Sequence, residues 1–349
     1  MISDLTQQRF GALKDFVEGL EDPGRWLVLT HDNPDPDSLA SAALLARVLK
    51  QAFKQKVTMA YGGIIGRAEN REMVRALGLR LSHMRHLNLK QYKYFALVDT
   101  QPRTGNNSLP DSVVPTLVID HHPARRATSQ VPLADIRTDY GATATIVAEY
   151  LLASGLQPSP TGATAMVYAI RSETQDFARE SPGPDKAIYD LMLSRANKRL
   201  LGKIQSAPLP ATYFRNLHEA LENLISVDTL VVSQLGAVEQ PDIVPEIADL
   251  LLRLEGKTWA LCTGLFEGRI YLSIRTTNPR AEAGRLMRRL IGRRGKGGGH
   301  SMIAGGWMEL RNGDPAAQQR ALGERLARLL RKKPEKLAPV TLGLKAGPA

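Results

Sequence analysis

Acidic and histidine side chains are concentrated in three short segments of this sequence, each directly after an apolar run. The first segment is His31-Asp32-Asn33-Pro34-Asp35-Pro36-Asp37, the second is Asp99, and the third is Asp120-His121-His122. Imidazole and carboxylate groups together suit Mn²⁺, Mg²⁺ or similar divalent ions rather than thiophilic metals. Without a cation, so many negative charges in one place would cost heavily in repulsion and desolvation. The residue types therefore favour a divalent-metal site, provided that the fold brings the three segments together.

The elements around these segments predict an α/β fold. Continuous apolar runs are typical of strands buried on both faces of a parallel sheet, and here they alternate with helix-like segments. The expected strands are residues 26–29, 57–60, 94–98 and 116–119, and the expected helices are 38–50, 69–77, 141–153 and 162–170. The three segments follow the first, third and fourth strands. A doubly wound, mostly parallel sheet would place them at its carboxyl edge, where ligands bind.

Asp35 and Asp37 can face one site, because residues i and i+2 of an extended segment point the same way. Two divalent ions about 3.5–4 Å apart, bridged by a carboxylate, recur in sites that hydrolyse phosphoesters. The ions lower the pKa of a water and neutralise charge on the phosphoryl oxygens. A lone aspartate at a strand end is often a helix cap or a turn residue. The hypothesis of a two-metal phosphoesterase therefore rests on the three segments together.

The second half of the chain predicts a smaller α/β domain. Its expected strands are residues 229–232, 258–265 and 269–274, and its expected helices are 245–254, 281–291 and 314–331. The turn Glu267-Gly268 joins the last two strands into a hairpin. We expect two domains with a cleft between them. The predicted boundaries are 1–185 for a metal-binding domain, 186–225 for a helical connector, 226–335 for a substrate-binding domain and 336–349 for a flexible tail.

A glycine run, Gly295-Lys296-Gly297-Gly298-Gly299-His300, lies in a strongly basic part of the chain. Between Pro279 and Gly299, seven Lys or Arg residues stand against one acidic residue. Glycines let backbone N–H groups approach a phosphate, and the Arg275 guanidinium suits a bidentate phosphate contact. These residues predict an anion-binding element. The alternative is a loop that ends a helix, with the arginines in salt bridges.

The composition is consistent with an anionic small-molecule or oligonucleotide partner. The net charge of +11 suits a nucleotide, an oligonucleotide or polyphosphate.

The single cysteine, Cys262, cannot form an internal disulfide, and no apolar segment follows a basic start, so a cytoplasmic protein is expected. No apolar run is long enough for a membrane span. Aromatic residues make up 5% of the chain and do not interleave with the basic ones, which argues against a long single-strand track.

The chemistry-bearing segments resemble the motifs of the DHH phosphoesterase family. The segment from His31 to Ala42 is similar to the family's first motif, Asp99 to its second, and Asp120-His121-His122 to the signature for which the family is named. Gly297-Gly298-Gly299-His300 resembles the glycine-rich motif of the associated C-terminal domain, so the resemblance covers nearly the whole chain. This pairing resembles the RecJ, oligoribonuclease (nano-RNase) and adenosine 3′,5′-bisphosphate phosphatase branch.

The resemblance implies a role for each matched residue. It implies two divalent cations, for which Mn²⁺ is expected, with Mg²⁺ and Co²⁺ as alternatives. One ion would be held by His31, Asp35 and Asp99, and the other by Asp37, Asp99 and His121, with Asp99 as the bridge. Asp120 would orient His121, and His122 would face the phosphate or the leaving group. The substrate's phosphates would be held by Arg275, Gly297, Gly298, Gly299 and His300.

The fourth family motif departs from the usual pattern. The family has an aspartate in a Thr-Asp-Thr setting, whereas this chain has Ser172-Glu173-Thr174. Glu173 therefore takes the ligand position for the second metal, with a side chain one methylene longer. Asp176 is a less favoured substitute, and the alternative is that both acids only solvate a helix end. Pro36, where the family commonly has a small residue, is a milder departure.

These observations predict hydrolysis of phosphoester bonds in short oligonucleotides or nucleotide phosphates. The chain lacks the extra oligonucleotide-binding domain of large RecJ-type nucleases, which favours short substrates over long DNA. The alternatives are a cyclic-dinucleotide phosphodiesterase, an exopolyphosphatase, or a nucleotide-binding regulatory protein whose fourth motif has decayed. No membrane partner is expected. A homodimer is compatible with the sequence, which does not determine the oligomeric state.

Overall fold

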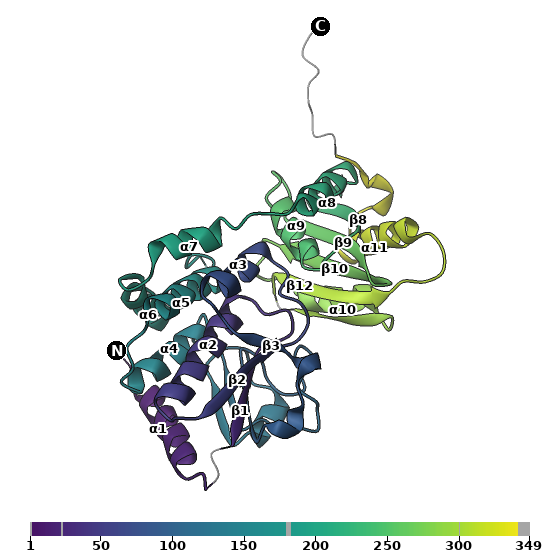
Figure 1. Ribbon diagram of the computed structural model, residues 1–349. Coiled ribbons are helices and arrows are strands. Elements are labelled where there is room, and N and C mark those ends of the chain that lie inside the picture. Colours follow the sequence, from purple (N-terminus) through teal and green to yellow (C-terminus); the bar gives the residue numbers. More distant parts are fainter. Residues whose placement is uncertain (1, 22–23, 179–182, 300, 341–349) are drawn as a thin grey trace. The chain divides into compact units, whose positions relative to one another are not determined.

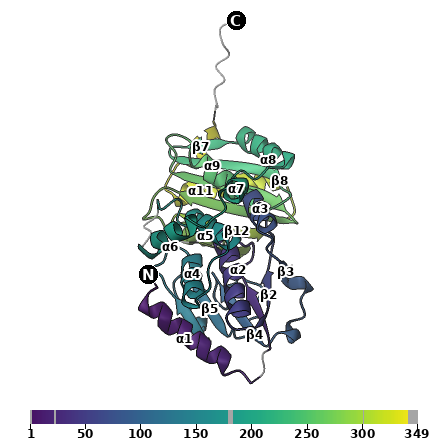
Figure 2. The ribbon, with the colours of Figure 1, turned by 60° about the vertical axis from the view of Figure 1, so that its left-hand side comes forward.

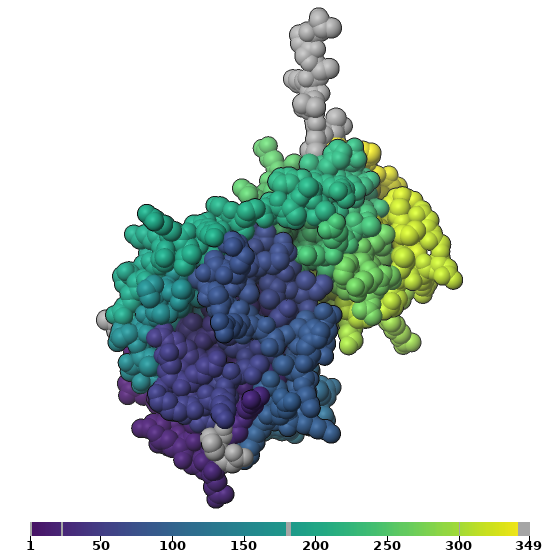
Figure 3. Space-filling view, in the orientation of Figure 1, coloured from purple at the N-terminus to yellow at the C-terminus, as the bar shows by residue number. Residues whose placement is uncertain are grey.

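The computed structural model describes residues 2–21, 24–178, 183–299 and 301–340 of the chain. It divides into two compact units with the boundary between Ala207 and Pro208 (Figures 1 and 3). The predicted connector is shared between them. The helices α6 (Gly183–Leu193) and α7 (Lys198–Gln205) belong to the first unit, and α8 (Ala211–Glu222) belongs to the second. In the part of the chain that the structure describes, no helix combines the length and the apolar character needed to cross a bilayer.

The first unit is built on a six-stranded parallel sheet in the order β3-β2-β1-β4-β5-β6. Figure 2 labels β2, β3, β4 and β5 of this sheet. Its strands are β1 (Arg25–Leu29), β2 (Lys56–Tyr61), β3 (Leu81–His83), β4 (Tyr94–Val98), β5 (Leu117–Asp120) and β6 (Leu133–Ile136). From β1 the chain proceeds outward to β3, and from β4 it proceeds outward in the other direction to β6. The neighbouring strands β1 and β4 therefore form a topological switch point, where open α/β sheets bind ligands.

The two faces of this sheet are covered differently. Trp26 and Val28 pack into a core with the helices α1 (Asp4–Glu18), α2 (Pro36–Gln51), α4 (Thr143–Ala153) and α5 (Pro160–Glu173). Leu27 and Leu29 point the other way and pack with Met84, from a 3₁₀ turn. The prediction of an α/β parallel sheet is confirmed, but turns and loops rather than long helices cover this second face. The remaining helix, α3 (Ala68–Ala76), joins β2 to β3.

The second unit has a seven-stranded mixed sheet in the order β11-β12-β10-β9-β8-β7-β13. The strands are β7 (Ile225–Val227), β8 (Leu230–Ala237), β9 (Trp259–Phe266), β10 (Arg269–Thr276), β11 (Gly295–Gly299), β12 (Ile303–Glu309) and β13 (Ala338–Pro339). The predicted hairpin is confirmed: β9 and β10 pair antiparallel through Glu267 and Gly268, both with positive φ. One face packs against α8 and α9 (Ile243–Leu251), and the other against α10 (Ala283–Ile291) and α11 (Pro315–Leu329).

The glycine run forms the strand β11 rather than the helix-ending loop that was the alternative to an anion-binding element. Residues Gly295–Gly299 pair with β12, and a Cβ on Gly295 would lie 1.9 Å from the carbonyl oxygen of Trp307. A Cβ on Gly297 would lie 2.6 Å from Cδ1 of Ile291 in α10. Close packing of β12 and α10 against β11 therefore explains these two glycines without a ligand. A Cβ on Gly298 would meet nothing within 4 Å, so this position stays open.

Candidate metal centre

The three chemistry-bearing segments meet at the switch point of the first sheet. His31 follows the end of β1 at Leu29, Asp99 follows the end of β4, and Asp120 is the last residue of β5. Because β1 pairs with β4 and β4 pairs with β5, their carboxyl ends are adjacent. Asp99 has a φ of 59°, a left-handed conformation that aspartate tolerates better than most residues. This turn of the backbone directs the chain out of the sheet at the site.

The first ligand group consists of His31, Asp35 and Asp99. His31 Nε2 lies 3.5 Å from Asp35 Oδ1 and 3.6 Å from Asp99 Oδ2. His31 Nδ1 is 2.9 Å from the carbonyl oxygen of Asp32, so this nitrogen donates and Nε2 is the ring nitrogen that faces the carboxylates. Asp35 is the N-cap of α2 and forms a capping box with Ser38, which fixes its carboxylate at the helix start.

The second ligand group consists of Asp99, His121 and His122. Asp99 Oδ1 lies 3.6 Å from His121 Nε2 and 3.7 Å from His122 Nδ1. His121 Nδ1 is held 3.2 Å from the carbonyl oxygen of Tyr140. His121 Nε2 is buried and has no hydrogen-bond partner among the residues that the structure describes. A buried nitrogen aimed at a carboxylate, yet too far away to bond with it, is the arrangement expected of a cation ligand.

These separations fit two ligands of one ion. Distances of 3.5–3.7 Å exceed the hydrogen-bonding range. Ligand atoms about 2.1 Å from a shared ion lie roughly 3.0–3.4 Å apart, close to what is observed. Asp99 presents Oδ2 to the first group and Oδ1 to the second, an arrangement that allows this carboxylate to bridge two ions. The donor set of imidazoles and carboxylates fits Mn²⁺ or a similar ion.

Asp37 lies beside these groups, bound to the start of a helix. Its two carboxylate oxygens accept the backbone N–H groups of Thr143 and Ala144, at 2.8 and 2.7 Å. The N-cap residue of α4, Ala142, has no capping side chain, so Asp37 supplies the cap from α2. Among the described residues, the groups whose ligand atoms lie within 4.8 Å of one another do not include Asp37. Its role as a ligand stays a prediction.

Glu173, the last residue of α5, belongs to the surroundings of the site. Burial raises the pKa of Asp37 well above its usual value, and the charges of Asp99, Asp35 and Glu173 raise it further. The Glu173 carboxylate is therefore close enough to act on the centre. Asp176 is exposed and forms an ion pair with Arg171. The geometry favours Glu173 over Asp176 for the fourth motif, although its coordination of a metal stays a prediction.

One predicted contact is wrong: Asp120 does not hold His121. Asp120 Oδ1 accepts from His122 instead, at 2.9 Å from Nδ1 and 3.2 Å from the backbone nitrogen. The physical reason is that β5 ends at Asp120 and the chain bends at His121 and His122, which brings the His122 side chain back to Asp120. Asp120 therefore orients His122, and the carbonyl of Tyr140 orients His121.

The electrostatics of the centre are dominated by crowded carboxylates. Burial lowers the pKa of His31, but Asp35 and Asp99 outweigh it and raise that pKa well above the usual 6.5. Burial raises the pKa of Asp35, yet contacts with His31 and Ser38 hold it well below 3.8. Burial also opposes protonation of His122, but the hydrogen bond to Asp120 and the charge of Asp99 raise its pKa to about 9. The site therefore favours positive charge.

Sequence analysis missed several residues that support the centre. Gln101 is buried, donates to Asp120 Oδ2 at 2.7 Å, and accepts from Thr128 Oγ1 and from the backbone of Arg125. The Thr143 hydroxyl donates to Asp99 Oδ1 at 2.9 Å. The available signals were weak: Gln101 lies two residues after Asp99, and Thr143 lies at the predicted helix start.

The second unit places Arg275 in a buried position. Its Nε lies 2.5 Å from Asp249 Oδ1 in α9, and its Nη1 donates to Ser273 Oγ at 2.8 Å. Gly297 and Gly299 are in close contact with neighbouring elements, whereas Gly298 is open. His300, the last residue predicted to hold the substrate, lies outside the described residues. Phosphate binding by this element stays a prediction.

Comparison with known proteins identifies relatives of both units. The model of the DHH family, N-terminal domain, matches residues 25–194, and that of the DHHA1 domain matches residues 228–331. The chain is 32% identical over 280 residues to the uncharacterized protein MJ1633 of Methanocaldococcus jannaschii, covering 80% of this chain and 56% of that protein. It is 23% identical over 291 residues to the A-adding tRNA nucleotidyltransferase of Geobacter sulfurreducens, covering 80% of this chain and 32% of that protein.

The chain thus spans about half the length of the first relative and a third of the second. Among solved structures, an exopolyphosphatase-related protein from Bacteroides fragilis has a TM-score of 0.69 and 14% sequence identity. This likeness covers 93% of this chain and 98% of the other. At that identity the comparison shows a shared fold.

Proposed function

Since this chain belongs to the DHH family and carries the DHHA1 domain, we propose that it hydrolyses phosphoester bonds with two divalent cations. The observation that carries the proposal is Asp99, whose two carboxylate oxygens face two separate histidine groups. A structural aspartate needs no such arrangement. When bound, the cations would supply an activated water and neutralise charge on the phosphoryl oxygens. We propose Mn²⁺ as the ion, because imidazole and carboxylate donors are mixed.

The chain's own residues divide the remaining tasks. His31, Asp35 and Asp99 would hold one cation, and Asp37, Asp99, His121 and Glu173 would hold the other. His122 is half exposed, and its Nδ1 is engaged by Asp120. Its Nε2 is then the nitrogen that can donate to a phosphoryl or leaving-group oxygen. Gln101 fixes Asp120, and through it the orientation of His122.

We propose short oligonucleotides or nucleotide phosphates as the substrate class. The excess of positive charge, +11 over the chain, suits an anionic substrate. The DHHA1 domain contributes the open Gly298 and the basic helix α10, with Arg285, Arg288 and Arg289. We assign Arg275, the glycine strand and His300 to phosphate binding on the strength of the family resemblance. The described residues do not themselves test this assignment.

The test is a product analysis with and without Mn²⁺. The substrates are short oligoribonucleotides, a 3′,5′-bisphosphate, a cyclic dinucleotide and polyphosphate. We expect Mn²⁺-dependent release of mononucleotide or phosphate from a nucleotide substrate. We also expect loss of turnover in His121→Ala but not in the matched variant His218→Ala, because His218 is an exposed residue paired with Glu222 on α8.

Three results would contradict the proposal in different ways. Turnover of polyphosphate alone would replace the substrate class, since that polymer yields phosphate without a nucleoside. Tight Mn²⁺ binding without any turnover would favour a regulatory nucleotide-binding protein. Equal activity of His121→Ala and His218→Ala would remove the metal centre from the reaction.

A further inference from the structure

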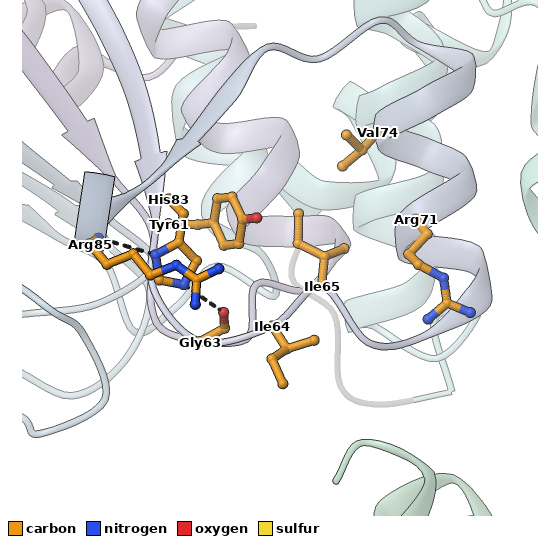
Figure 4. A pocket seen from close by; sticks show the side chains of 8 residues that line it. All are labelled: Tyr61, Gly63, Ile64, Ile65, Arg71, Val74, His83 and Arg85. Atoms are coloured by element: carbon orange, nitrogen blue, oxygen red, sulfur yellow. Dashed lines mark hydrogen bonds between the residues drawn. The ribbon is translucent and has the colours of Figure 1, made fainter. Parts of the chain in front are cut away.

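A pocket of about 430 Å³ lies at the carboxyl ends of β2 and β3 in the first unit (Figure 4). Nothing in the proposed two-metal chemistry uses it. Its walls come from the end of β2, the loop that follows, helix α3 and the turn after β3. The residues that define its character are Tyr61, Ile64, Arg71, Val74, His83 and Arg85.

One wall is a fixed aromatic corner. The Tyr61 and His83 rings lie 5.2 Å apart at an interplanar angle of 70°. His83 Nδ1 accepts the backbone N–H of Arg85 at 3.1 Å, so its ring proton lies on Nε2 and is donated to the carbonyl oxygen of Gly63 at 3.0 Å. Both ring nitrogens are thus engaged by the backbone. His83 presents an aromatic surface to the pocket rather than a group for proton transfer.

The other walls are apolar, with cations at the rim. Ile64, Ile65 and Val74 are partly exposed and line the pocket. Arg71 and Arg85 contribute guanidinium groups, which attract anions and stack on aromatic rings. The volume lies within the range of small-molecule sites. Aromatic and aliphatic walls beside two cations fit a flat, uncharged heteroaromatic ring that is attached to a phosphate.

The pocket is coupled to the metal-binding loop by hydrogen bonds. The backbone N–H of Ile64 donates to Asn33 Oδ1 at 2.8 Å, and the N–H of Asn33 donates to the carbonyl of Gly62 at 3.0 Å. Gly63 has a φ of 65° and no room for a Cβ, which would lie 2.4 Å from Asn33 Oδ1. Asn33 itself lies between His31 and Asp35. The pocket wall and the first ligand group are therefore parts of one hydrogen-bonded unit.

The spacing of the strands gives the distance between the pocket and the metal-binding loop. The metal-binding loop follows β1, and the pocket lies at the ends of β2 and β3, the next strands in the sheet. Neighbouring strands are about 4.8 Å apart, so one to two spacings correspond to roughly 5–10 Å. A nucleoside attached to a phosphate at the centre can cover such a span.

We propose that this pocket binds the nucleobase of the nucleoside next to the phosphate that is cleaved. This assignment rests on the proposed function and deepens it, because polyphosphate has no base to place there. It makes Tyr61, Ile64 and His83 specificity-determining residues, and leaves the chemistry to the metal centre.

The experiment compares a 5′-phosphorylated diribonucleotide with an analogue in which one nucleoside is replaced by an abasic ribose. Stacking of a base on an aromatic side chain contributes a preference of about 5- to 150-fold. We expect the wild-type protein to prefer the base-containing substrate by a kcat/KM ratio in that range, chiefly through KM. Tyr61→Ala and Ile64→Trp should bring the ratio toward one. Tyr61→Phe, which keeps the ring, should retain the preference.

The control is Val114→Trp, which introduces the same bulk at an exposed position and should leave kcat/KM unchanged for both substrates. An unchanged ratio in Tyr61→Ala and Ile64→Trp, or an equal loss on both substrates, would overturn the assignment. A separate measurement is calorimetric binding of adenosine monophosphate with a metal chelator present. If no phosphoester is hydrolysed but Tyr61→Ala weakens this binding, the pocket stands and the proposed function fails. Hydrolysis without a preference for the base-containing substrate would support the proposed function and overturn the assignment of the pocket. If there is neither hydrolysis nor an effect of Tyr61→Ala on binding, the proposed function and the assignment of the pocket both fail.

Discussion

The first unit contains two buried charged clusters that differ in how their charges are balanced. In the cluster around Arg137, the guanidinium lies 2.6 Å from Asp135 Oδ2 and 3.0 Å from Glu149 Oε2. The hydroxyl of Tyr150 donates to Asp135 Oδ2 at 3.0 Å, and that of Tyr140 donates to Glu149 Oε1 at 3.1 Å. In the metal centre, the corresponding separations between histidine nitrogens and carboxylate oxygens are 3.5–3.7 Å.

The difference shows how a structural network can be told from a site that needs an external ion. The Arg137 cluster carries its own cation, and neutral hydroxyl donors complete it. The metal centre brings carboxylates together without a permanent cation, and His121 Nε2 has no partner among the described residues. The two clusters also differ in exposure: Arg137, Asp135 and Glu149 are 1–3% exposed, whereas Asp35 and His122 are 38% and 48% exposed. Contact distance, exposure and the sign of the uncompensated charge therefore distinguish the two clusters.

The largest expected effect comes from Asp99→Asn. Removing the bridging charge should lower kcat/KM about 10³-fold, since metal-ion stabilisation of a transition state amounts to several kcal/mol. Without metal, the free energy of unfolding should change little, because the relieved repulsion with Asp37 is offset by the lost attraction to His31 and His122. Steady-state kinetics and urea unfolding with a chelator measure the two quantities. Asp190→Asn on α6, an exposed partner of Lys186, is the control. Turnover within tenfold of wild type would contradict the bridging role.

In contrast to Asp99→Asn, the main effect of Arg137→Met should be a loss of stability. It leaves Asp135 and Glu149 buried without their cation, and breaking a buried pair from one side costs about 3–5 kcal/mol of the free energy of unfolding. Urea unfolding measures this cost, and added Mn²⁺ should not restore it. Arg328→Met, which breaks an exposed pair with Glu324, should cost less than about 1 kcal/mol. Similar losses of unfolding free energy in both variants would mean that the Arg137 cluster contributes no more to stability than a surface pair.

The parts of the centre that could be predicted from sequence are those tied to strand ends. Continuous apolar runs identified β1, β4 and β5, and the residues directly after them are necessarily at the carboxyl edge. By contrast, β6 was not predicted, because Asp135 interrupts its apolar pattern; its buried carboxylate is paired with Arg137, two residues on, and with Tyr150 in α4. The length of the apolar run thus decided which strands the sequence revealed.

Contacts between segments far apart in the chain could not be predicted. Asp37 caps α4, a helix whose own N-cap residue is an alanine, and nothing local to Asp37 indicates this. The glycine strand β11 was missed because glycine has low β-propensity, and packing against α10 and β12 imposes the strand. Asp120 was assigned to the wrong histidine, because that choice depends on the bend of the chain at His121 and His122.

Addition of Mn²⁺ should stabilise the wild-type protein by an intermediate amount. A ligand that binds only the folded state raises the free energy of unfolding by about 2.7 kcal/mol at 100 times its Kd. The centre is the expected place of binding, so Glu173→Gln should reduce the stabilisation. Asp176→Asn should not, because Asp176 is exposed and paired with Arg171. Thermal unfolding with and without Mn²⁺ checks this, and the opposite order of the two variants would assign the fourth motif to Asp176.

The smallest expected effect concerns Tyr150 in the Arg137 cluster. At neutral pH, Tyr150→Phe removes a hydrogen bond to Asp135 and should cost about 1 kcal/mol. Burial, and next the charge of Asp135, raise the pKa of Tyr150 well above 10. Above pH 10 the folded state therefore retains a proton that the unfolded chain releases. The contribution of Tyr150 is fully present below pH 10 and is lost as the pH rises further.

Stability of the wild-type protein should consequently fall with pH above 10 more steeply than that of Tyr150→Phe, by up to about 1.4 kcal/mol per pH unit. Urea unfolding at pH 8, 10 and 10.5 measures both slopes. Tyr140 and Tyr168, whose pKa values are also raised, remain in both proteins and cancel in the comparison. Parallel slopes would mean that Tyr150 ionises as readily in the folded protein as in the unfolded chain. The Arg137 cluster would then not be the closed network that its short contacts indicate.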